Sequence, residues 1–463
     1  MKVKLLGKTS KELIDKQIQI CATAGKLSRM PGTVFDAYES MEDPEKALKF
    51  INRVISMGHT STIDHDYLVF ALSEVSPIVE QTIIEERFSS FTIKSRREVN
   101  FANVGYYTPE FNDKNLTKKY QKHMEYLFSN YQNLIDLNIP KEDARFILPY
   151  SYHSEIIMGL DGTSLTRMIN NLTKTKLSNI PELKELGLKL YEITKKRAPY
   201  IETLVEKVPI HNYSDTENIL NSLGIKKQYS LLENPVLLNY TNNIDETIFI
   251  NAISPIYSKT IEDASVIYNT KIKDDDKLKE KLMKSLFNET NCEDLRQINF
   301  RFQLSIPFAI LTHYTRHRRI SLSIPDFVPN VDLEKYITPP TIKNNKEARD
   351  IYKRIYIENN KIYNEFKSAN ISEESLAYFT LSGNAVNVII NFDGEAFRWI
   401  CRLRECNKAQ WFIRDSFSKM HKSIAKICTY YAKNVGPDCE TKHICGEEKE
   451  SCGKINIILK NLK

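Results

Sequence analysis

The amino-acid sequence contains the same order of expected elements twice, and this internal repeat restricts the fold more than any other feature. An apolar run opens each copy, and a strand-like segment followed by a helix comes after it at nearly the same spacing. Three landmarks occur in both copies: Val3 and Val236, Pro77 and Pro307, and LDGTSL at 160–165 with FDGEAF at 392–397. Landmarks in register indicate a duplicated unit of about 230 residues. The chain is therefore expected to fold as two copies of one domain.

The length and the local patterns support two α+β domains. A chain of 463 residues exceeds what one hydrophobic core usually supports. We expect a first repeat at 1–206, a linker at 207–233 and a second repeat at 234–463. Apolar periodicity predicts strands at 3–6, 67–72, 236–239 and 299–304, and helices at 11–21, 44–57 and through most of 114–206.

Composition excludes several classes of protein. The 41% hydrophobic and 27% charged fractions are typical of a soluble globular protein. The net charge of +6 comes from 65 basic and 59 acidic residues that are largely interspersed, which suits small anionic substrates and does not indicate a nucleic acid polymer. The sequence shows neither a secretory signal nor an apolar stretch long enough to cross a bilayer, so we expect no membrane partner and a cytoplasmic location.

A late group of cysteines raises the question of a metal. It comprises Cys428, Cys439, Cys445 and Cys452, and His443 lies between Cys439 and Cys445. The spacing of these residues is not that of a zinc knuckle. In a reducing compartment free thiols are the simpler interpretation, and we expect no metal ligands here.

The stretch Arg316-His317-Arg318, with Ser321 close behind, is the strongest candidate for chemistry. Two guanidiniums that flank an imidazole are poorly suited to a core and well suited to a phosphate or an anionic ring. The alternative is a solvated basic helix end.

These residues resemble the signature of the flavin-dependent thymidylate synthases. That signature is Arg-His-Arg, two residues, Ser, one residue, Asn, two residues, Ser, one residue, Arg, and it follows a strand and a helix as it does here. The chain is also similar to the family in an arginine before Leu-Pro, at Arg145, and in Arg404 ahead of Ala409-Gln410-Trp411. The resemblance covers most of both halves and implies two tandem family domains, each a mixed sheet flanked by long helices.

Each half matches the signature only in part, and the two parts complement each other. In the second half the Arg-His-Arg is intact, but Asp326 and Val328 stand where the later Ser and Arg belong. In the first half Glu85 and Glu86 replace the start of Arg-His-Arg, while the later Ser and Arg are present as Ser95 and Arg97.

The same division recurs at other family positions. The first half keeps the segment His59, Ser61, Asp64 and His65, whose counterpart around 291–297 is lost. The first half also keeps Arg145, where the second half has Tyr378. Conversely, the second half keeps Arg404, where the first half has Leu172 or Thr173. A complementary pattern favours one composite site that takes one wall from each repeat. The histidines at 59 and 65 could instead simply cap a turn.

The resemblance implies a reaction and a set of roles. The family methylates C5 of dUMP to give dTMP, with methylenetetrahydrofolate as carbon donor, reduced FAD as hydride donor and NADPH as the usual reductant of the flavin. By match to the family, Arg404 is the catalytic residue. The implied cofactor-binding residues are His59, Ser61, Asp64, Arg316, His317, Arg318 and Ser321. The implied substrate-binding residues are Ser95, Arg96, Arg97, Arg145, His313, Arg316 and Arg404.

The resemblance also implies an assembly, since the family enzyme is a homotetramer with active sites built from several subunits. Two chains of two repeats each would reproduce that arrangement as a homodimer. Some family positions are changed, such as the flavin-gripping Asn-x-Arg, which reads Asp161-Gly162-Thr163 and Asp393-Gly394-Glu395. Two alternatives therefore stay open: a flavin enzyme acting on another pyrimidine nucleotide, and a non-catalytic nucleotide-binding homologue.

Overall fold

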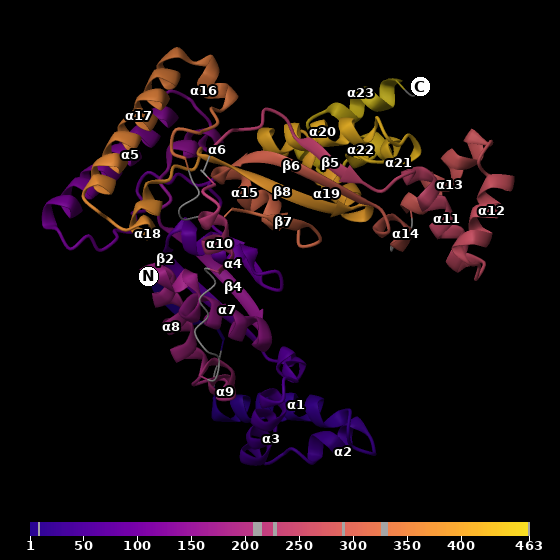
Figure 1. Ribbon diagram of the computed structural model, residues 1–463, viewed down its shortest axis with the longest axis horizontal. Coiled ribbons are helices and arrows are strands. Elements are labelled where there is room, and N and C mark those ends of the chain that lie inside the picture. Colours follow the sequence, from indigo (N-terminus) through magenta and orange to yellow (C-terminus); the bar gives the residue numbers. More distant parts are fainter. Residues whose placement is uncertain (8–9, 207–214, 226–228, 289–291, 326–331, 462–463) are drawn as a thin grey trace. The chain divides into compact units, whose positions relative to one another are not determined.

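The chain forms two compact units that do not coincide with its two halves (Figure 1). The computed structural model describes residues 1–7, 10–206, 215–225, 229–288, 292–325 and 332–461. Unit 1 consists of Met1–Gln228 and Thr338–Gly383, and unit 2 consists of Tyr229–Ile337 and Asn384–Lys463. A segment of the second half is therefore part of unit 1.

Unit 1 contains a four-stranded sheet of order β1-β2-β4-β3, with β1 at Lys2–Leu5, β2 at Tyr67–Val75, β4 at Ser154–Asp161 and β3 at Ser90–Ile93. Side chains of β2 alternate between buried and more exposed, as expected for a strand with one face on the core. The helices are α1 (Lys11–Leu27), α2 (Val34–Glu39), α3 (Pro44–Ser56), η1 (Thr60–His65), α4 (Pro77–Glu85), α5 (Lys114–Asp136), α6 (Lys141–Ala144), η2 (Arg145–Ile147), α7 (Gly162–Lys174), η3 (Lys176–Asn179), α8 (Pro181–Thr194), α9 (Ile201–Val205), α10 (Asp215–Ser222), α16 (Pro340–Asn344), α17 (Lys346–Ser368), α18 (Glu373–Leu376) and η4 (Ala377–Phe379).

Unit 2 contains a second sheet of order β5-β6-β8-β7, with β5 at Val236–Tyr240, β6 at Asn299–Pro307, β8 at Ala385–Asp393 and β7 at Ser321–Ser323. The helices are α11 (Ile244–Ile256), α12 (Ile261–Lys271), α13 (Asp276–Asn288), α14 (Glu293–Arg296), α15 (Phe308–Thr315), α19 (Gly394–Arg404), α20 (Trp411–Ile424), α21 (Tyr430–Lys433), α22 (Asp438–Thr441), η5 (Glu448–Glu450) and α23 (Lys454–Asn461).

The two sheets have the same strand order, and their central strands start in the same register. Tyr67 pairs with Asp161 and Asn299 with Asp393, and the first residues of β3 and β7 pair with equivalent positions of β4 and β8. The predicted duplication and the α+β class are confirmed. The sheets are not mixed, however, because every strand pairing among the described residues is antiparallel.

The repeated Asp-Gly landmark is the point at which a central strand turns into a helix. Asp161 accepts a hydrogen bond from the backbone N–H of Ser164 at 2.7 Å, and Asp393 accepts one from Ala396 at 2.6 Å, so each aspartate caps its helix. The glycines that follow have no room for a side chain, since a Cβ on Gly394 would lie 2.5 Å from a backbone oxygen. Helix capping and close backbone approach explain this dipeptide in both repeats.

Within unit 1, equivalent segments of the two repeats pair with each other. Pro149 forms an antiparallel bridge with Leu381, and the backbone N–H of Tyr150 donates to the carbonyl of Thr380 at 2.7 Å. The long helices α5 and α17 lie side by side (Figure 1), and the ring of Phe366 packs at the edge of Phe111. The segment 338–383 therefore completes the core of unit 1.

Some expectations need correction. Residues 114–206 are mostly helical, as predicted, but the prediction omits β4, whose short apolar alternation resembles part of a helix. The expected linker at 207–233 falls partly outside the described residues, and α10 is the helix within it. Across the described ranges, no helix combines the length and the apolar character that crossing a membrane requires.

A buried carboxyl group joins the segment 338–383, which comes from the second half of the chain, to the first repeat. Glu182 accepts hydrogen bonds from the backbone N–H and the hydroxyl of Ser76, at 2.9 and 2.6 Å, and from the hydroxyl of Tyr378 at 2.8 Å. We expect Tyr378→Phe to lower the free energy of unfolding by about 1–3 kcal/mol, because it removes a hydrogen bond to a buried carboxyl group. Urea denaturation at neutral pH measures the loss. Tyr126→Phe on α5 is the control, and equal stability of the two variants would contradict the assignment.

Candidate functional site

The Arg-His-Arg stretch forms the turn between α15 and β7. The backbone N–H of His317 donates to the carbonyl of Tyr314 at 3.0 Å, and that of Ile320 donates to the carbonyl of His317 at 3.2 Å. The turn leaves Arg316 and Arg318 exposed and the imidazole of His317 mostly covered. The charged side chains of Arg316 and Arg318 thus precede and follow a largely buried imidazole ring.

The held ring binds the predicted catalytic residue. Nε of Arg404, the last residue of α19, donates to Nε2 of His317 at 2.9 Å. Burial and the neighbouring guanidiniums of Arg404 and Arg316 lower the pKa of His317 to about 3. The imidazole is therefore neutral at physiological pH and can accept this bond, which fixes the plane of the guanidinium.

The other arginines near Arg404 have acidic or backbone partners. Arg398 forms an ion pair with Glu395 at 2.7 Å, and Arg402 forms one with Asp438 at 2.6 Å. Arg414 donates to the carbonyl of Asn407 at 2.8 Å. Within this group, Arg404 is the arginine that donates to a histidine ring.

The remaining second-repeat candidates lie on the same two elements. His313 is half-buried on the last turn of α15, and Ser321 is exposed as the first residue of β7. Asp326 and Val328, which stand at the later signature positions, lie outside the described residues. Unit 2 therefore brings together Arg316, His317 and Arg404.

The first-repeat candidates that follow β3 form a group of cations in unit 1. Arg96 is buried, and its Nη1 donates to both oxygens of Glu80 at 2.7 Å and also contacts the hydroxyl of Tyr152. Arg97 donates from Nε to Glu142 at 2.7 Å. Ser95 is exposed, and its hydroxyl accepts the backbone N–H of Arg97 at 3.3 Å. Arg96 has thus taken a structural partner, while Ser95 stays at the surface.

Arg145 is the most unusual member of this group. Its side chain is 2% exposed, its Nε donates to the carbonyl of Glu142 at 3.1 Å, and its buried Nη2 has no hydrogen-bond partner among the described residues. Burial and the neighbouring Arg96 lower the pKa of Arg145 to about 10. A buried cation with an unsatisfied donor is costly unless an anion joins it. The site is therefore suited to a phosphate.

The segment His59–His65 forms a separate group at η1. Nε2 of His59 lies 3.1 Å from Nη2 of Arg29, and Ser61, Asp64 and His65 are all exposed. His59 is the residue before η1, but its side chain makes no capping hydrogen bond. The side chain of His59 therefore gives no support to the alternative that this histidine simply caps a turn.

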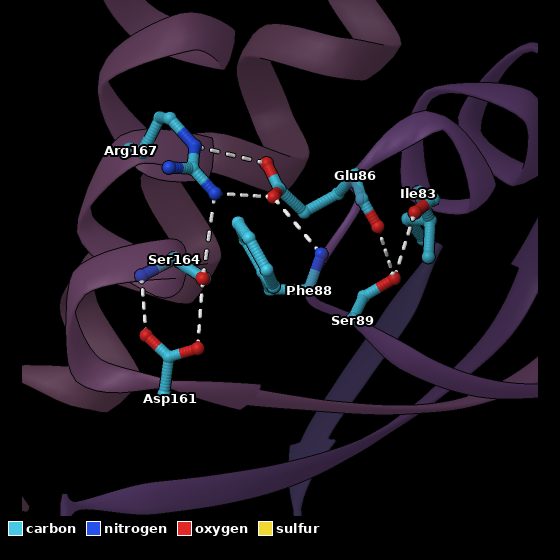
Figure 2. Close-up of polar contacts among 7 residues, drawn as sticks. All are labelled: Ile83, Glu86, Phe88, Ser89, Asp161, Ser164 and Arg167. Carbon is cyan, nitrogen blue, oxygen red and sulfur yellow. Dashed lines mark hydrogen bonds and ion pairs between the residues drawn. The ribbon is translucent and has the colours of Figure 1, made fainter. Parts of the chain in front are cut away.

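The position equivalent to Arg-His-Arg in the first repeat is closed by an internal ion pair (Figure 2). Glu86 binds Arg167 of α7, with Nε of Arg167 3.2 Å from the carboxylate, and Arg167 also reaches the hydroxyl of Ser164 at 3.4 Å. Ser164 in turn donates to Asp161 at 2.8 Å. Where the second repeat has the ring of His317, the first repeat has the carboxylate of Glu86, which is paired with Arg167.

Two residues of the candidate site were missed in the sequence. Glu142 holds both Arg97 and Arg145, and Arg29 contacts His59. The spacing of Glu142 three residues before Arg145 was a usable signal, because residues at that spacing adjoin on a helix. Nothing local marked Arg29, which comes from the end of α1.

Comparisons with known proteins identify the family of the chain. The sequence profile of the thymidylate synthase complementing protein family matches residues 10–200 and again 236–428. The flavin-dependent thymidylate synthase of Clostridium tetani is 27% identical over 217 residues, 43% of this chain and 84% of that protein. The enzyme of the same name from Geobacter sulfurreducens is 24% identical over 156 residues, 33% of this chain and 66% of that protein.

A solved structure gives a weaker match. Flavin-dependent thymidylate synthase from Helicobacter pylori, complexed with FAD and dUMP, covers 45% of this chain and 98% of its own, with 19% identity and a TM-score of 0.34. That score is too low to support an argument about geometry. The family profile matches most of each repeat, and the chain belongs to the thymidylate synthase complementing protein family as a tandem duplication of the family domain.

Proposed function

We propose that the chain is a flavin-dependent thymidylate synthase that methylates dUMP to dTMP. Family membership and the names of the relatives support this proposal. The observation that carries it is the bond from Arg404 to the neutral ring of His317, which holds a permanent positive charge beside the most intact part of the signature. The carbon donor is methylenetetrahydrofolate, and NADPH supplies the reducing equivalents.

The nucleotide phosphate binds the cation group of the first repeat. Ser95 supplies a hydroxyl, and Arg97 and Arg145 supply forked guanidinium donors, which match a phosphate geometrically. The unsatisfied Nη2 of Arg145 fits this role, because an anion there would satisfy a buried donor. Arg96, bound to Glu80, acts on the substrate indirectly by fixing the backbone between Ser95 and Arg97.

Arg404 stabilises the pyrimidine ring as negative charge develops at N3 and O4. A guanidinium stays protonated at any working pH, so it acts as an electrostatic stabiliser and not as an acid or base. His317 orients the guanidinium without adding charge. His313, one turn before Arg316 on α15, completes the contacts to the substrate.

FAD is held by residues from both repeats. Arg316, Arg318 and Ser321 suit its pyrophosphate and ring edge, and His59, Ser61 and Asp64 suit its other end. The exposed guanidiniums beside a neutral acceptor fit an anionic cofactor. When bound, the flavin supplies the hydride that completes the methyl group.

Each repeat supplies one wall of a composite site, and two chains form the working homodimer. The Glu86–Arg167 pair in the first repeat supports this division, because the carboxylates of Glu85 and Glu86 stand where the second repeat has Arg316 and His317. The enzyme is proposed to act in the cytoplasm.

Loss of Arg404 tests the function directly. We expect Arg404→Ala to reduce tritium release from C5-labelled dUMP by about 10²–10³-fold, because one transition-state donor is removed. Arg404→Lys should also lose most activity, since lysine keeps the charge but lacks the Nε–H that His317 accepts. A yellow, FAD-containing protein that releases tritium at the wild-type rate in both variants would exclude this role.

Matched substitutions at one signature position test the composite site. Arg316→Ala is expected to weaken FAD retention and slow turnover, whereas Glu85→Ala, at the equivalent position of the first repeat, should leave both unchanged. The flavin absorbance of the purified protein and the tritium assay are the readouts. A large loss of turnover in Glu85→Ala would contradict the assignment of one working signature.

Arg145 should show opposite effects on stability and on binding. We expect Arg145→Met to abolish the rise in melting temperature that dUMP causes, while the melting temperature without dUMP is unchanged or higher, because an unpaired buried charge is removed. Lys118→Met, an exposed cation on α5, serves as control. If Arg145→Met unfolds the ligand-free protein, Nη2 has a structural partner and the phosphate assignment is wrong.

His317 should make stability depend on pH. The unfolded chain protonates this ring below about pH 6.5, but the folded chain does so only near a pKa of about 3. The unfolded state therefore binds more protons between these values, and stability falls as pH falls. We expect His317→Gln, which keeps an acceptor, to lose less melting temperature than the wild type between neutral pH and mild acid. Identical pH profiles would show that the ring is not buried in its neutral form.

A further inference from the structure

Four cysteines line one small cavity beyond the end of α19. They are Cys406, just after Arg404, together with Cys439, Cys445 and Cys452. Cys428, which the sequence groups with the last three, is not among them and instead contacts the carbonyl of Ile424 in the core. The cavity is therefore lined by Cys406 and by three members of the late cysteine group, but not by Cys428.

The size of this cavity limits what it can hold. Its volume is about 20 Å³, and a cavity needs about 10–15 Å³ to hold one water molecule. It therefore has room for a single atom-sized guest and not for an organic ligand. Four thiols from three chain segments around such a space form a ligand set of the kind that soft divalent ions prefer.

The chain that carries three of these cysteines has no hydrophobic core of its own. From Asp438 to Asn461 no residue is buried, although α22, η5 and α23 are all formed. The surface ion pairs of this segment, such as Lys408 with Glu450, are worth about 0–1 kcal/mol each. Segments without a core are usually held by a disulfide or a metal ion, and all eight cysteines of the chain are unpaired here.

The surroundings of the thiols suit a metal thiolate centre. Nδ2 of Asn407 donates to Sγ of Cys452 at 3.6 Å. Lys408 and Lys454 also line the cavity. Glu405 and Glu447 line it as well, and both lysines also pair with carboxylates, Lys408 with Glu450 and Lys454 with Glu440. Bonds from amides to sulfur and nearby cations are the outer contacts that such ligands need.

We propose that Cys406, Cys439, Cys445 and Cys452 bind one Zn²⁺ ion as a structural tetrathiolate site. Binding replaces four S–H bonds with four Zn–S bonds and releases four protons, with no change in oxidation state. In the described part of the chain no three such side chains are yet close enough to hold an ion. Zinc binding would therefore require the side chains of these four cysteines to rotate toward the ion, to Zn–S distances of about 2.3 Å.

This proposal replaces the expectation of free thiols. The spacing of Cys439, Cys445 and Cys452 is wider than that of a zinc knuckle, and the fourth ligand comes from a distant part of the sequence. The inference does not rest on the proposed enzyme activity, because metal content can be measured without turnover.

Metal analysis of the purified full-length chain is the primary test. We expect about one zinc per chain, falling to near zero in Cys445→Ser and in Cys452→Ser. Cys21→Ala, which removes a buried thiol of α1, is the matched control and should retain its zinc. Cobalt substitution adds a spectroscopic test, since a tetrahedral tetrathiolate site gives strong visible and sulfur-to-metal charge-transfer bands that each variant should lose.

Limited proteolysis keeps the test decisive if the cysteine variants fold poorly. Removal of zinc from the wild-type chain with a chelator should expose cleavage sites within 438–461, and added zinc should restore protection. A chain that remains metal-free after expression with added zinc would overturn the proposal. So would disulfides among these four cysteines, or equal loss of zinc in Cys21→Ala.

Discussion

Unit 1 depends on the pairing between equivalent segments of the two repeats at Pro149 and Leu381. The backbone N–H of Ser382 donates to the carbonyl of Leu148 at 2.9 Å, and that of Tyr150 donates to Thr380, so the two repeats exchange the same kind of bond. Such mutual contacts are typical of a two-fold interface. The pairing brings α17 onto α5, where His123 contacts Asn359 at 2.9 Å. The first repeat would therefore leave one face of α5 uncovered if it stood alone.

The arginines that form ion pairs within the fold differ in their partners from the two arginines of the candidate site. Arg96 and Arg402 are matched by carboxylates, and each pair can be understood as part of the fold. Arg404 is held by a neutral ring, and Arg145 retains an unsatisfied buried donor. A carboxylate partner neutralises a guanidinium, whereas the neutral ring of His317 orients the guanidinium of Arg404 without cancelling its charge.

Much of the fold could be predicted from the sequence, because the repeat fixed the order of the elements and the Asp-Gly landmark marked both strand-to-helix turns. Strand β4 was missed, since a short apolar alternation between helical stretches resembles a helix. The placement of 338–383 in unit 1 could not be predicted, because it depends on contacts such as Tyr378 with Glu182 that are almost two hundred residues apart.

The candidate site was predictable where a motif carried it and not where burial decided it. The sequence marked Arg316, His317 and Arg404 through the signature, but it could not show that the ring is neutral or that it binds Arg404. The signature gave Arg96 and Arg97 the same role, whereas in the structure Arg96 is buried and donates to Glu80. The partners of these residues come from other elements, and long-range packing leaves no local pattern in one sequence.

The end of α19 links the enzyme chemistry to the cysteine cavity. Three consecutive residues there are held by three separate parts of unit 2. Arg404 binds His317, Glu405 lies 3.1 Å from Nδ1 of His421, and Cys406 lines the cavity. The family profile ends at residue 428, so the other three cysteines lie beyond it. A metal ion at Cys406 would fix the backbone two residues from Arg404, the proposed catalytic residue, and would thereby determine how firmly its guanidinium is positioned.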